Sequence, residues 1–379
     1  MDLNALRDQI NQIDRQMVGL FKNRMQISAD IAQYKTEHNL PIHNKARERE
    51  VLFSISEMAG NDLEGYARVL YATLFDLSRS YQARKTYISS ELTDRIHKAL
   101  DTTPKLFPQK GSVACQGIEG AYSQLACEKL FALPNITFFK TFEGVFQAVE
   151  SGLCEFGVLP IENSSYGSVN GVYDLMHRHH FHIVKSIRLH IDHHLLAKPG
   201  TKLSEIREII SHEQALGQCS KFLSSIPNLK VTVAKNTAEA AELVASSDRN
   251  DLAAISSQSC IELYRLQLLS DDVQNTENNY TRFICIAKDL LIYPGSDKMS
   301  LMFTLSHQPG ALYQMIAKFA ALGVNLTKLE SRPIPGSDFE FLFYFDLEAS
   351  GYSNDILFLL SELSQTNQLF TFLGCYSEI

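Results

Sequence analysis

The sequence predicts a multi-domain protein in which an all-α part is followed by an α/β part and an α+β part. Residues 1–100 contain a single proline, Pro41, and carry apolar residues at helical spacing. Short apolar runs then alternate with helical patterns, and a strand–helix–strand–strand–helix–strand pattern begins at Lys298. The 379 residues suffice for about two to four domains. We expect domain boundaries at 1–95, 110–290 and 297–379.

The composition argues against several classes of partner. Charged residues make up 21% of the chain and apolar residues 45%, with a formal net charge of −8. This balance argues against binding to nucleic acid or to an acidic membrane. The apolar runs are too short to cross a membrane, and MDLNALRDQI does not resemble a signal peptide. We therefore expect a cytoplasmic protein without nucleic-acid or membrane partners.

The cysteines and histidines give little sign of a metal. Seven scattered cysteines include no CxxC pair, which is typical of reduced thiols in a core. The twelve histidines include a cluster at residues 177–182, where alternation in a β-like stretch favours a surface edge over a metal site. We expect no metal and no cofactor.

A long first helix, at residues 3–37, is predicted by a stripe of apolar residues at steps of three and four. The stripe is formed by Leu3, Leu6, Ile10, Ile13, Met17, Leu20, Ile27, Ile31 and Tyr34. Further helices are expected after Asn44, which can cap one, and from about residue 62. A helix about 50 Å long cannot bury its stripe against two shorter partners. An intertwined homodimer is therefore expected.

A cationic pocket is predicted on the first helix, because Arg24 interrupts the apolar stripe. Lys35, eleven residues on, lies about 20° away on a helical wheel. A buried charge must be paired, so the two residues indicate either structural salt bridges or a pocket for a small polyanion. The polar residues that flank the stripes are Arg7, Arg24, Lys35, Arg47, Glu48, Ser78 and Gln82. This set holds no nucleophile, but it can bind a dianion and stabilise developing charge.

Residues 1–90 resemble the helical chorismate mutase family through ALRDQINQIDRQMVGLFKNRM, IAQYK, the RERE segment and SRSYQ. The resemblance implies rearrangement of chorismate to prephenate without acid or base. It also implies that Arg24, with Arg7 of the partner subunit, binds the two carboxylates. Lys35 and Gln82 would bind the ether oxygen and Glu48 the ring hydroxyl, with Arg47 and Ser78 close by. Asn44 stands where the family usually has aspartate, so weaker contact with the substrate is expected there.

Four fragments of the α/β part end strand patterns and are rich in neutral hydrogen-bonding groups. They are QGIEGAYSQ, PIENSSYGSV, SHEQALGQC and NYTRF. In a largely parallel sheet such ends line the ligand site, so Asn163, Ser164, Ser211, Gln218 and Thr281 are expected around a carboxylated ligand. Ser211 beside His212 is a weaker alternative as a nucleophile pair, since adjacent residues of an extended segment point apart.

These fragments are similar to prephenate dehydratase over residues 110–290, with PIEN and TRF as the most specific marks. The resemblance implies two α/β lobes around a cleft, similar to periplasmic binding proteins, and conversion of prephenate to phenylpyruvate. Thr281 would hydrogen-bond the leaving hydroxyl. Asn163, Ser211 and Gln218 would orient the substrate, with Glu162, Arg282 and Phe283 as neighbours. The stretch TTPKLFPQKG, at 102–111, is predicted to be a flexible linker to this part.

The last part resembles a phenylalanine-sensing ACT domain through GAL at 310–312 and ESRP at 330–333. Strands are predicted at 299–305, 324–332, 339–347 and 368–376, with a helix opened by Pro309 and another at 352–365. The resemblance implies a ferredoxin-like fold and a site for phenylalanine. That site would be formed by Gly310, Ala311, Leu312, Asn325, Leu326, Glu330 and Ser331.

Together the resemblances imply a bifunctional enzyme that is at least a dimer. Its partners would be chorismate, prephenate and inhibitory L-phenylalanine. Three alternatives stay open. Arogenate could replace prephenate as substrate, the chain could be a non-catalytic amino-acid sensor, or the helical part could serve dimerisation alone.

Overall fold

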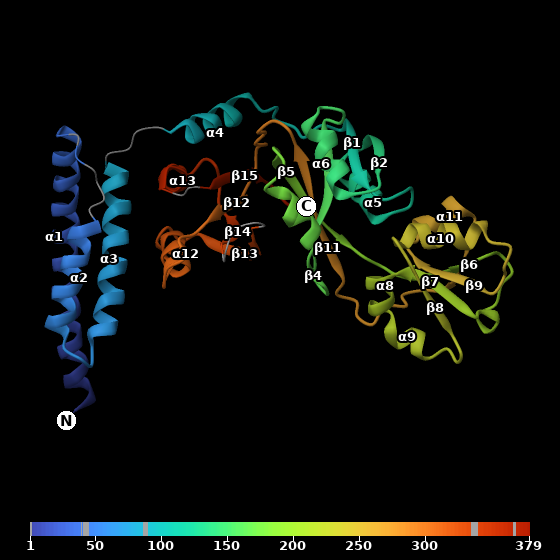
Figure 1. Ribbon diagram of the computed structural model, residues 1–379, viewed down its shortest axis with the longest axis horizontal. Helices are drawn as coiled ribbons and strands as arrows, with labels where there is room; N and C mark the ends of the chain where they lie inside the picture. Colours follow the sequence, from blue (N-terminus) through green and yellow to red (C-terminus); the bar gives the residue numbers. More distant parts are fainter. Residues whose placement is uncertain (1, 39, 41–44, 86–89, 335–339, 367–368) are drawn as a thin grey trace. The chain divides into compact units, whose positions relative to one another are not determined.

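The computed structural model describes residues 2–38, 40, 45–85, 90–334, 340–366 and 369–379 (Figure 1). The chain divides into two compact units. The first comprises residues 1–98 and 301–371, and the second comprises residues 99–300 and 372–379. No helix among the described residues is both long and apolar enough to cross a membrane.

Three helices open the chain, as the apolar spacing predicts. They are α1 (Leu3–Glu37), α2 (Lys45–Ala59) and α3 (Glu64–Lys85). The Asp2 side chain caps α1 by accepting a hydrogen bond from the Asn4 amide at 3.2 Å. The helix α3 packs along α1, and α2 packs on α3 (Figure 1). The predicted cap at Asn44 lies outside the described residues.

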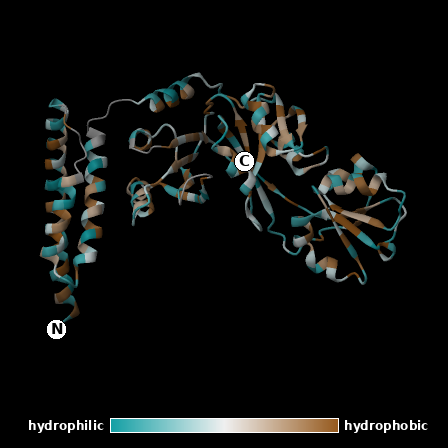
Figure 2. Ribbon diagram, viewed as in Figure 1, coloured by the Kyte–Doolittle hydropathy of each residue, from teal (hydrophilic) through white to brown (hydrophobic). Residues whose placement is uncertain are grey.

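The predicted apolar stripe is not the face of α1 that packs within the chain. The buried residues of α1 are Met25, Ser28 and Ala32, which face α3. The stripe residues Leu3, Ile10 and Leu20 are between 58% and 69% exposed, and hydrophobic segments recur along this helix in Figure 2. A contiguous exposed stripe of this kind is typical of an interaction surface.

Residues 298–376 form a four-stranded sheet with two helices in the order βαββαβ. The elements are β12 (Lys298–Thr304), α12 (Ala311–Ala321), β13 (Asn325–Pro333), β14 (Phe341–Glu348), α13 (Asn354–Thr366) and β15 (Phe370–Tyr376). The strand order is β13-β14-β12-β15, so β13 and β15 are the edges. Each bound lies within a few residues of its sequence prediction, because alternating and helical periodicities are clear here.

The segment before the α/β part is not the flexible linker that its prolines predict. The helix α4 (Glu91–Thr102) comes first. The Phe107 ring then packs 5.1 Å from the Phe131 ring and 5.0 Å from the Tyr293 ring, centroid to centroid. The Ile292 amide donates to Thr103 Oγ1 at 3.0 Å. Aromatic burial and backbone bonding therefore hold this segment against the second unit.

The second unit contains two sheets, each flanked by helices. The first sheet contains β1 (Lys110–Gln116), β2 (Leu133–Phe139), β3 (Phe156–Asn163), β4 (Gly167–Ser168), β5 (His182–His190) and β11 (Tyr280–Ala287), with helices α5 (Tyr122–Leu130), α6 (Phe142–Glu150) and α7 (Asn170–Met176). The second sheet contains β6 (His194–Ala197), β7 (Glu208–His212), β8 (Lys230–Ala234), β9 (Leu252–Ser256) and β10 (Gln267–Ser270), with η1 (Leu203–Glu205), α8 (Glu213–Gln218), α9 (Ser220–Ser224), α10 (Thr237–Ser246) and α11 (Ser259–Tyr264).

The first sheet is mixed, which corrects the expectation that every motif ends a parallel strand. The strand order is β2-β1-β3-β11-β5, and β11 runs antiparallel to β3 and β5. Thr281 therefore lies at the beginning of β11, opposite Asn163 at the end of β3. Because the two strands are antiparallel, the first residues of β11 lie beside the last residues of β3.

The histidine cluster is not a simple surface edge. The His179 side chain is only 9% exposed, and its Nδ1 lies 2.9 Å from Glu150 Oε2. Its ring stacks on the Phe146 ring at 5.2 Å. These contacts fix the turn between α7 and β5 to α6. All seven cysteines are free thiols and buried, as expected of core residues.

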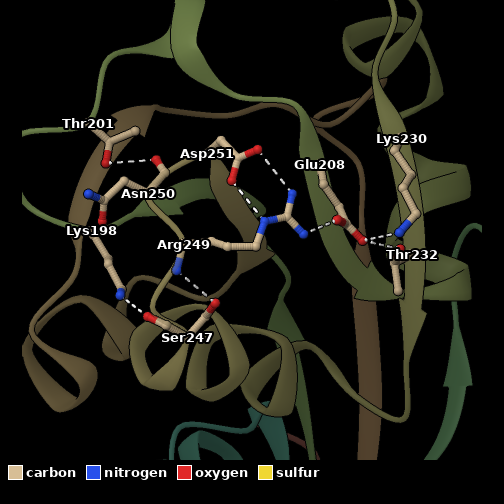
Figure 3. Close-up of polar contacts among 9 residues, drawn as sticks. All are labelled: Lys198, Thr201, Glu208, Lys230, Thr232, Ser247, Arg249, Asn250 and Asp251. Carbon is tan, nitrogen blue, oxygen red and sulfur yellow. Dashed lines mark hydrogen bonds and ion pairs between the residues drawn. The ribbon is translucent and has the colours of Figure 1, made fainter.

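Each sheet with its helices forms one lobe of the second unit. In the second lobe, the buried carboxylate of Glu208 on β7 contacts side chains of β8 (Figure 3). Glu208, 5% exposed, lies 2.9 Å from Lys230 Nζ and 2.6 Å from Arg249 Nη1, and it accepts a hydrogen bond from Thr232 Oγ1 at 2.6 Å. The Arg249 guanidinium also pairs with Asp251 at 2.9 Å. The hydrogen bonds from Thr232, Lys230 and Arg249 lower the pKa of Glu208 to about 2.

Candidate active sites

A cross-strand pair lies at the junction of the two lobes. The Asn163 Nδ2 atom donates to Thr281 Oγ1 at 2.9 Å. The Asn163 Oδ1 atom accepts from the backbone amides of Ser165 at 2.9 Å and Tyr166 at 3.1 Å, which fixes the orientation of the side chain. Because the Thr281 oxygen accepts from Asn163, its own O–H can donate to a bound ligand.

The second lobe and the connecting segments complete this polar cluster. Asn279 Oδ1 accepts from Asn163 Nδ2 at 2.9 Å and from Gln218 Nε2 at 3.1 Å. Gln218 Oε1 lies 2.6 Å from His193 Nε2. The two segments that connect the lobes are residues 191–193 and 271–279. They are joined to each other, since the Ile191 amide donates to the backbone carbonyl of Asn279 at 2.8 Å. Five side chains thus form one network, which can orient a polar ligand. They are those of Asn163, His193, Gln218, Asn279 and Thr281.

His193 and Asn279 are members of this cluster that the sequence reasoning missed. His193 is 2% exposed and Asn279 is 1% exposed. Burial lowers the pKa of His193, so the imidazole is neutral near pH 7. Gln218 Oε1 can only accept, so His193 Nε2 is the donor in their contact. Asn279 opens the NYTRF fragment, and that position was the signal that could have identified it.

Two predicted residues use their hydroxyls in backbone contacts. Ser164 Oγ donates to the Asn278 carbonyl at 3.0 Å and accepts from the Tyr280 amide at 2.9 Å. Ser211 is fully buried and donates to the Ile255 carbonyl at 2.6 Å. Both contacts stabilise the local backbone, and both hydroxyls are therefore already bonded to backbone groups.

The remaining predicted neighbours do not face the cluster. Successive side chains of a strand point to opposite faces, and Arg282 pairs with Glu162 at 3.0 Å on the reverse face. The Arg282 side chain is 5% exposed. Phe283 follows a register shift and lies in the core of the first lobe. These residues therefore stabilise the first sheet and do not line the polar cluster.

The helical part brings together a second set of predicted residues. The Arg24 guanidinium donates to Ser78 Oγ and, at 3.4 Å, to the Leu74 carbonyl. It also lies 5.5 Å from the centre of the Phe75 ring. Ser78 and Gln82 are buried, one helical turn apart on α3. An arginine held by a hydroxyl and a ring is suited to binding a carboxylate.

An ion-pair network that the sequence reasoning missed lies beside this pair. The Arg79 guanidinium pairs with Glu48 on α2 and with Asp76 on α3. Asp76 is 6% exposed, and its burial raises its pKa. Arg79 lies within the SRSYQ segment. Its adjacency to Ser78 was the available signal, but the pairing itself depends on how α2 packs.

The other predicted residues of the helical part are dispersed. Lys35 is partly buried near the end of α1. Arg47 is exposed and pairs with Glu50 at 3.1 Å. Arg7 is exposed 17 residues before Arg24, which is about 26 Å along a helix. Arg7 therefore cannot reach Arg24 within one chain.

The predicted regulatory residues lie at two places, the start of α12 and the edge strand β13. Gly310 caps α12 with a φ of 84°, a conformation that favours glycine, and Ala311 and Leu312 begin that helix. The others lie on the edge strand β13. Asn325 Nδ2 donates to Glu348 Oε2 at 2.9 Å, and Glu330 lies 3.9 Å from Lys328 Nζ. Leu326 and Ser331 belong to the same strand.

Comparisons with known proteins identify both parts. The prephenate dehydratase family matches residues 113–290, and the chorismate mutase type II family matches residues 6–83. The bifunctional chorismate mutase/prephenate dehydratase of Escherichia coli is 30% identical over 383 residues, covering 99% of this chain and 96% of that protein. The chain belongs to this bifunctional family. It combines a chorismate mutase with a prephenate dehydratase.

Similarity is higher over the part shared with plant proteins. The arogenate dehydratase/prephenate dehydratase 1 of Arabidopsis thaliana is 39% identical over 284 residues, covering 70% of this chain and 72% of that protein. Among solved structures, one described as the quorum quenching acylase GqqA is 32% identical with a TM-score of 0.64, covering 70% and 98% of the two chains. Prephenate dehydratase from Arthrobacter aurescens in complex with L-Phe is 25% identical with a TM-score of 0.65, covering 70% and 90%.

Proposed function

We propose that the dehydratase reaction takes place at the network of Asn163, Thr281, Asn279 and Gln218. Prephenate loses its ring carboxylate as carbon dioxide, and the electrons of that bond form the last double bond of the aromatic ring. The ring C–O bond breaks, and the departing hydroxide takes up a proton to leave as water. The Asn163–Thr281 hydrogen bond carries this proposal, because it orients the Thr281 O–H for donation to the leaving oxygen.

The mutase site is proposed at Arg24, Lys35, Glu48, Ser78 and Gln82. The rearrangement needs a fixed conformation and stabilisation of charge on the ether oxygen. Arg24 binds a carboxylate, Lys35 and Gln82 bind the ether oxygen, and Glu48 binds the ring hydroxyl. The Arg79–Glu48 ion pair supports this assignment, because it orients the Glu48 carboxylate. Arg47 stays a proposed neighbour of the substrate.

The mutase part is proposed to act as an intertwined dimer. The exposed stripe of α1 supports this, because a second copy of the helix would remove that apolar surface from water. The same arrangement would allow Arg7 of the partner subunit to reach the pocket of Arg24. The active enzyme is therefore at least a homodimer.

Residues 297–379 are proposed to be a ferredoxin-like ACT domain that binds L-phenylalanine as a feedback inhibitor. The βαββαβ order and the glycine at the start of α12 support this, as does the L-Phe complex of the Arthrobacter aurescens dehydratase. The site is proposed near Gly310, Ala311 and Leu312, together with Asn325, Leu326, Glu330 and Ser331 of the edge strand.

The remaining proposals concern domains and location. The mutase domain is proposed at 1–95 and the dehydratase at 110–290. Ser164 and Ser211 stay proposed site residues because of their place in the fragments that resemble prephenate dehydratase. A cytoplasmic location is proposed on the strength of the seven unpaired cysteines.

One assay tests these proposals together. The purified protein is given chorismate, and prephenate and phenylpyruvate are followed with and without phenylalanine. We expect both products in succession, with the second suppressed by phenylalanine. Accumulation of prephenate alone would favour arogenate, the substrate named for plant relatives that are 37–39% identical, and arogenate is then supplied directly. Unchanged chorismate would mean that the helical part serves dimerisation alone.

A further inference from the structure

Residues 377–379 form a parallel β-bridge with β5 of the dehydratase sheet. They follow β15 directly and run parallel to β5. The Ser186 amide donates to the Ser377 carbonyl at 3.0 Å, the Ile379 amide to the Ser186 carbonyl at 3.0 Å, and the Arg188 amide to the Ile379 carbonyl at 2.9 Å. Because β5 ends the strand order of its sheet, this segment occupies an otherwise open sheet edge.

The close approach of β15 to β5 depends on a glycine. A Cβ atom on Gly374 would lie 2.1 Å from the Ile183 carbonyl oxygen, and the φ of Gly374 is 153°. Any larger residue would have to displace backbone. The backbone of Gly374 thereby lies against Ile183 of β5, just before residues 377–379 begin.

The Glu378 carboxylate gathers four polar groups behind the active site. It lies 3.0 Å from Arg188 Nε, 3.5 Å from Lys298 Nζ and 3.9 Å from Arg282 Nε. It also accepts a hydrogen bond from Ser186 Oγ at 3.1 Å. The Glu378 side chain is 11% exposed, and Arg282 and Lys298 are 5% and 18% exposed, so their interactions are less screened than those at an open surface, whereas the Arg188 side chain is 59% exposed.

The Glu378 carboxylate lies close to two arginines, of which Arg282 is the one next to Thr281 in β11. Arg282 and Arg188 face each other directly across β11 and β5, and like charges opposite one another destabilise a strand pair. Glu378 lies beside both guanidiniums and offsets their repulsion. On the other side Arg282 pairs with Glu162 at 3.0 Å. The pair Glu162–Arg282 directly neighbours the pair Asn163–Thr281 in the same two strands.

We propose that Glu378 is a positioning residue of the dehydratase, which acts through Arg282 to hold Thr281 in register with Asn163. We further infer that residues 377–379 carry the state of the regulatory sheet to the active site, because they continue its last strand. This inference rests on the proposed function, since it takes Thr281 as the group that assists departure of the hydroxyl.

The first test compares Glu378→Gln with Glu128→Gln in the full-length protein. Glu128 is an exposed residue of α5, so its change removes the same charge without a buried network. We expect Glu378→Gln to lower the dehydratase kcat about tenfold or more, with the KM for prephenate within about twofold, because misplacement affects the transition state more than binding. Mutase turnover, measured on the same sample, stays unchanged. Equal dehydratase kcat in the two variants would overturn the proposal.

A second variant tests the charge argument itself. In Arg188→Gln/Glu378→Gln the opposing guanidinium is removed together with the carboxylate. We expect the double variant to regain most of the dehydratase kcat that Glu378→Gln loses, which is a coupling that a double-mutant cycle measures. Additive losses would mean that repulsion between Arg188 and Arg282 is not the cause. The double variant also gives a folded protein for assay if Glu378→Gln alone is unstable.

Inhibition by phenylalanine tests whether residues 377–379 link the regulatory sheet to the dehydratase site. Calorimetry measures L-phenylalanine binding, and the dehydratase assay measures inhibition. We expect a variant lacking residues 377–379 to bind phenylalanine within about threefold of the unaltered protein while its inhibition constant rises about tenfold. Retained inhibition would overturn the inferred route. If the unaltered protein does not bind phenylalanine, the proposed regulation is wrong, whereas the kcat comparison above still tests Glu378 as a positioning residue.

Discussion

Thr281 accepts a hydrogen bond from Asn163 at 2.9 Å, although the two residues are 118 positions apart in the chain. The pairing joins the end of β3 to the beginning of β11. It gives the threonine a fixed orientation before any ligand binds. Aromatisation of the ring already favours the dehydratase reaction. A hydrogen-bond donor that is oriented before the substrate binds is therefore the main contribution that the enzyme can make to the rate.

Loss of the Thr281 hydroxyl should remove the dehydratase activity selectively. We expect Thr281→Ala to lower dehydratase turnover about 100-fold or more while mutase turnover stays within about twofold, because the residues proposed for the mutase site belong to α1, α2 and α3 and not to β11. Thr281→Ser keeps the hydroxyl and should retain much of the activity. Both rates are measured on one preparation, and an equal loss of the two would indicate a structural threonine.

Loss of the Lys35 ammonium should have the opposite selectivity. Lys35→Ala is expected to lower mutase turnover about 100- to 1,000-fold, because the charge that develops on the ether oxygen loses its partner. Dehydratase turnover with added prephenate should not change. Lys22→Ala, at an exposed lysine of the same helix, is the control. Near-normal mutase turnover in Lys35→Ala would contradict the assigned site.

Arg79 should matter to the mutase without touching substrate. We expect Arg79→Gln to lower mutase turnover about tenfold, because Glu48 loses the guanidinium that orients it, as seen when supporting residues of a site are removed. Arg68→Gln removes an exposed arginine that pairs with Glu64 on the same helix, and it should be neutral. Similar rates for these two variants would mean that Glu48 is positioned by other contacts.

A charge in the stripe of α1 should dissociate the proposed dimer. Ile10 is 58% exposed within one chain, so Ile10→Glu should not damage the fold of the chain itself. In a dimer it would bury a carboxylate at an apolar seam. Analytical ultracentrifugation should report a lower mass for Ile10→Glu and an unaltered mass for Gln9→Glu. An unchanged mass in both variants would refute the stripe as the interface.

The Glu208 network should stabilise the second lobe in a pH-dependent manner. Its lowered pKa, about 2 against an ordinary 4.5, makes the contribution complete above pH 4.5 and removes it as the pH falls towards 2. We expect Glu208→Gln to cost about 1–2 kcal/mol at pH 7, because exposed partners screen part of the charge. Glu242→Gln, on the exposed face of α10, is the control. In thermal melts the difference should vanish near pH 2, and a difference independent of pH would argue against the carboxylate.

Local patterns were sufficient for much of the fold. The helix at 3–37 and the βαββαβ order after Lys298 follow from periodicity and turn residues alone. The prediction of a flexible linker was wrong because the Phe107 ring packs against the Phe131 ring, a contact that no local sequence pattern encodes. Arg79 and His193 were missed for the same reason, since their partners come from other elements.

The sequence by itself determined which residue types are present and which short segments carry them, because secondary structure and turn chemistry depend on neighbours in the chain. Only the tertiary structure decided that β11 runs antiparallel to β3, which brings Thr281 to Asn163 on one face and Arg282 to Glu162 on the other. It also decided that Glu378 reaches Arg282 across the edge of the sheet. Pairings of this kind depend on strand direction and register, which are set by the packing of the whole lobe.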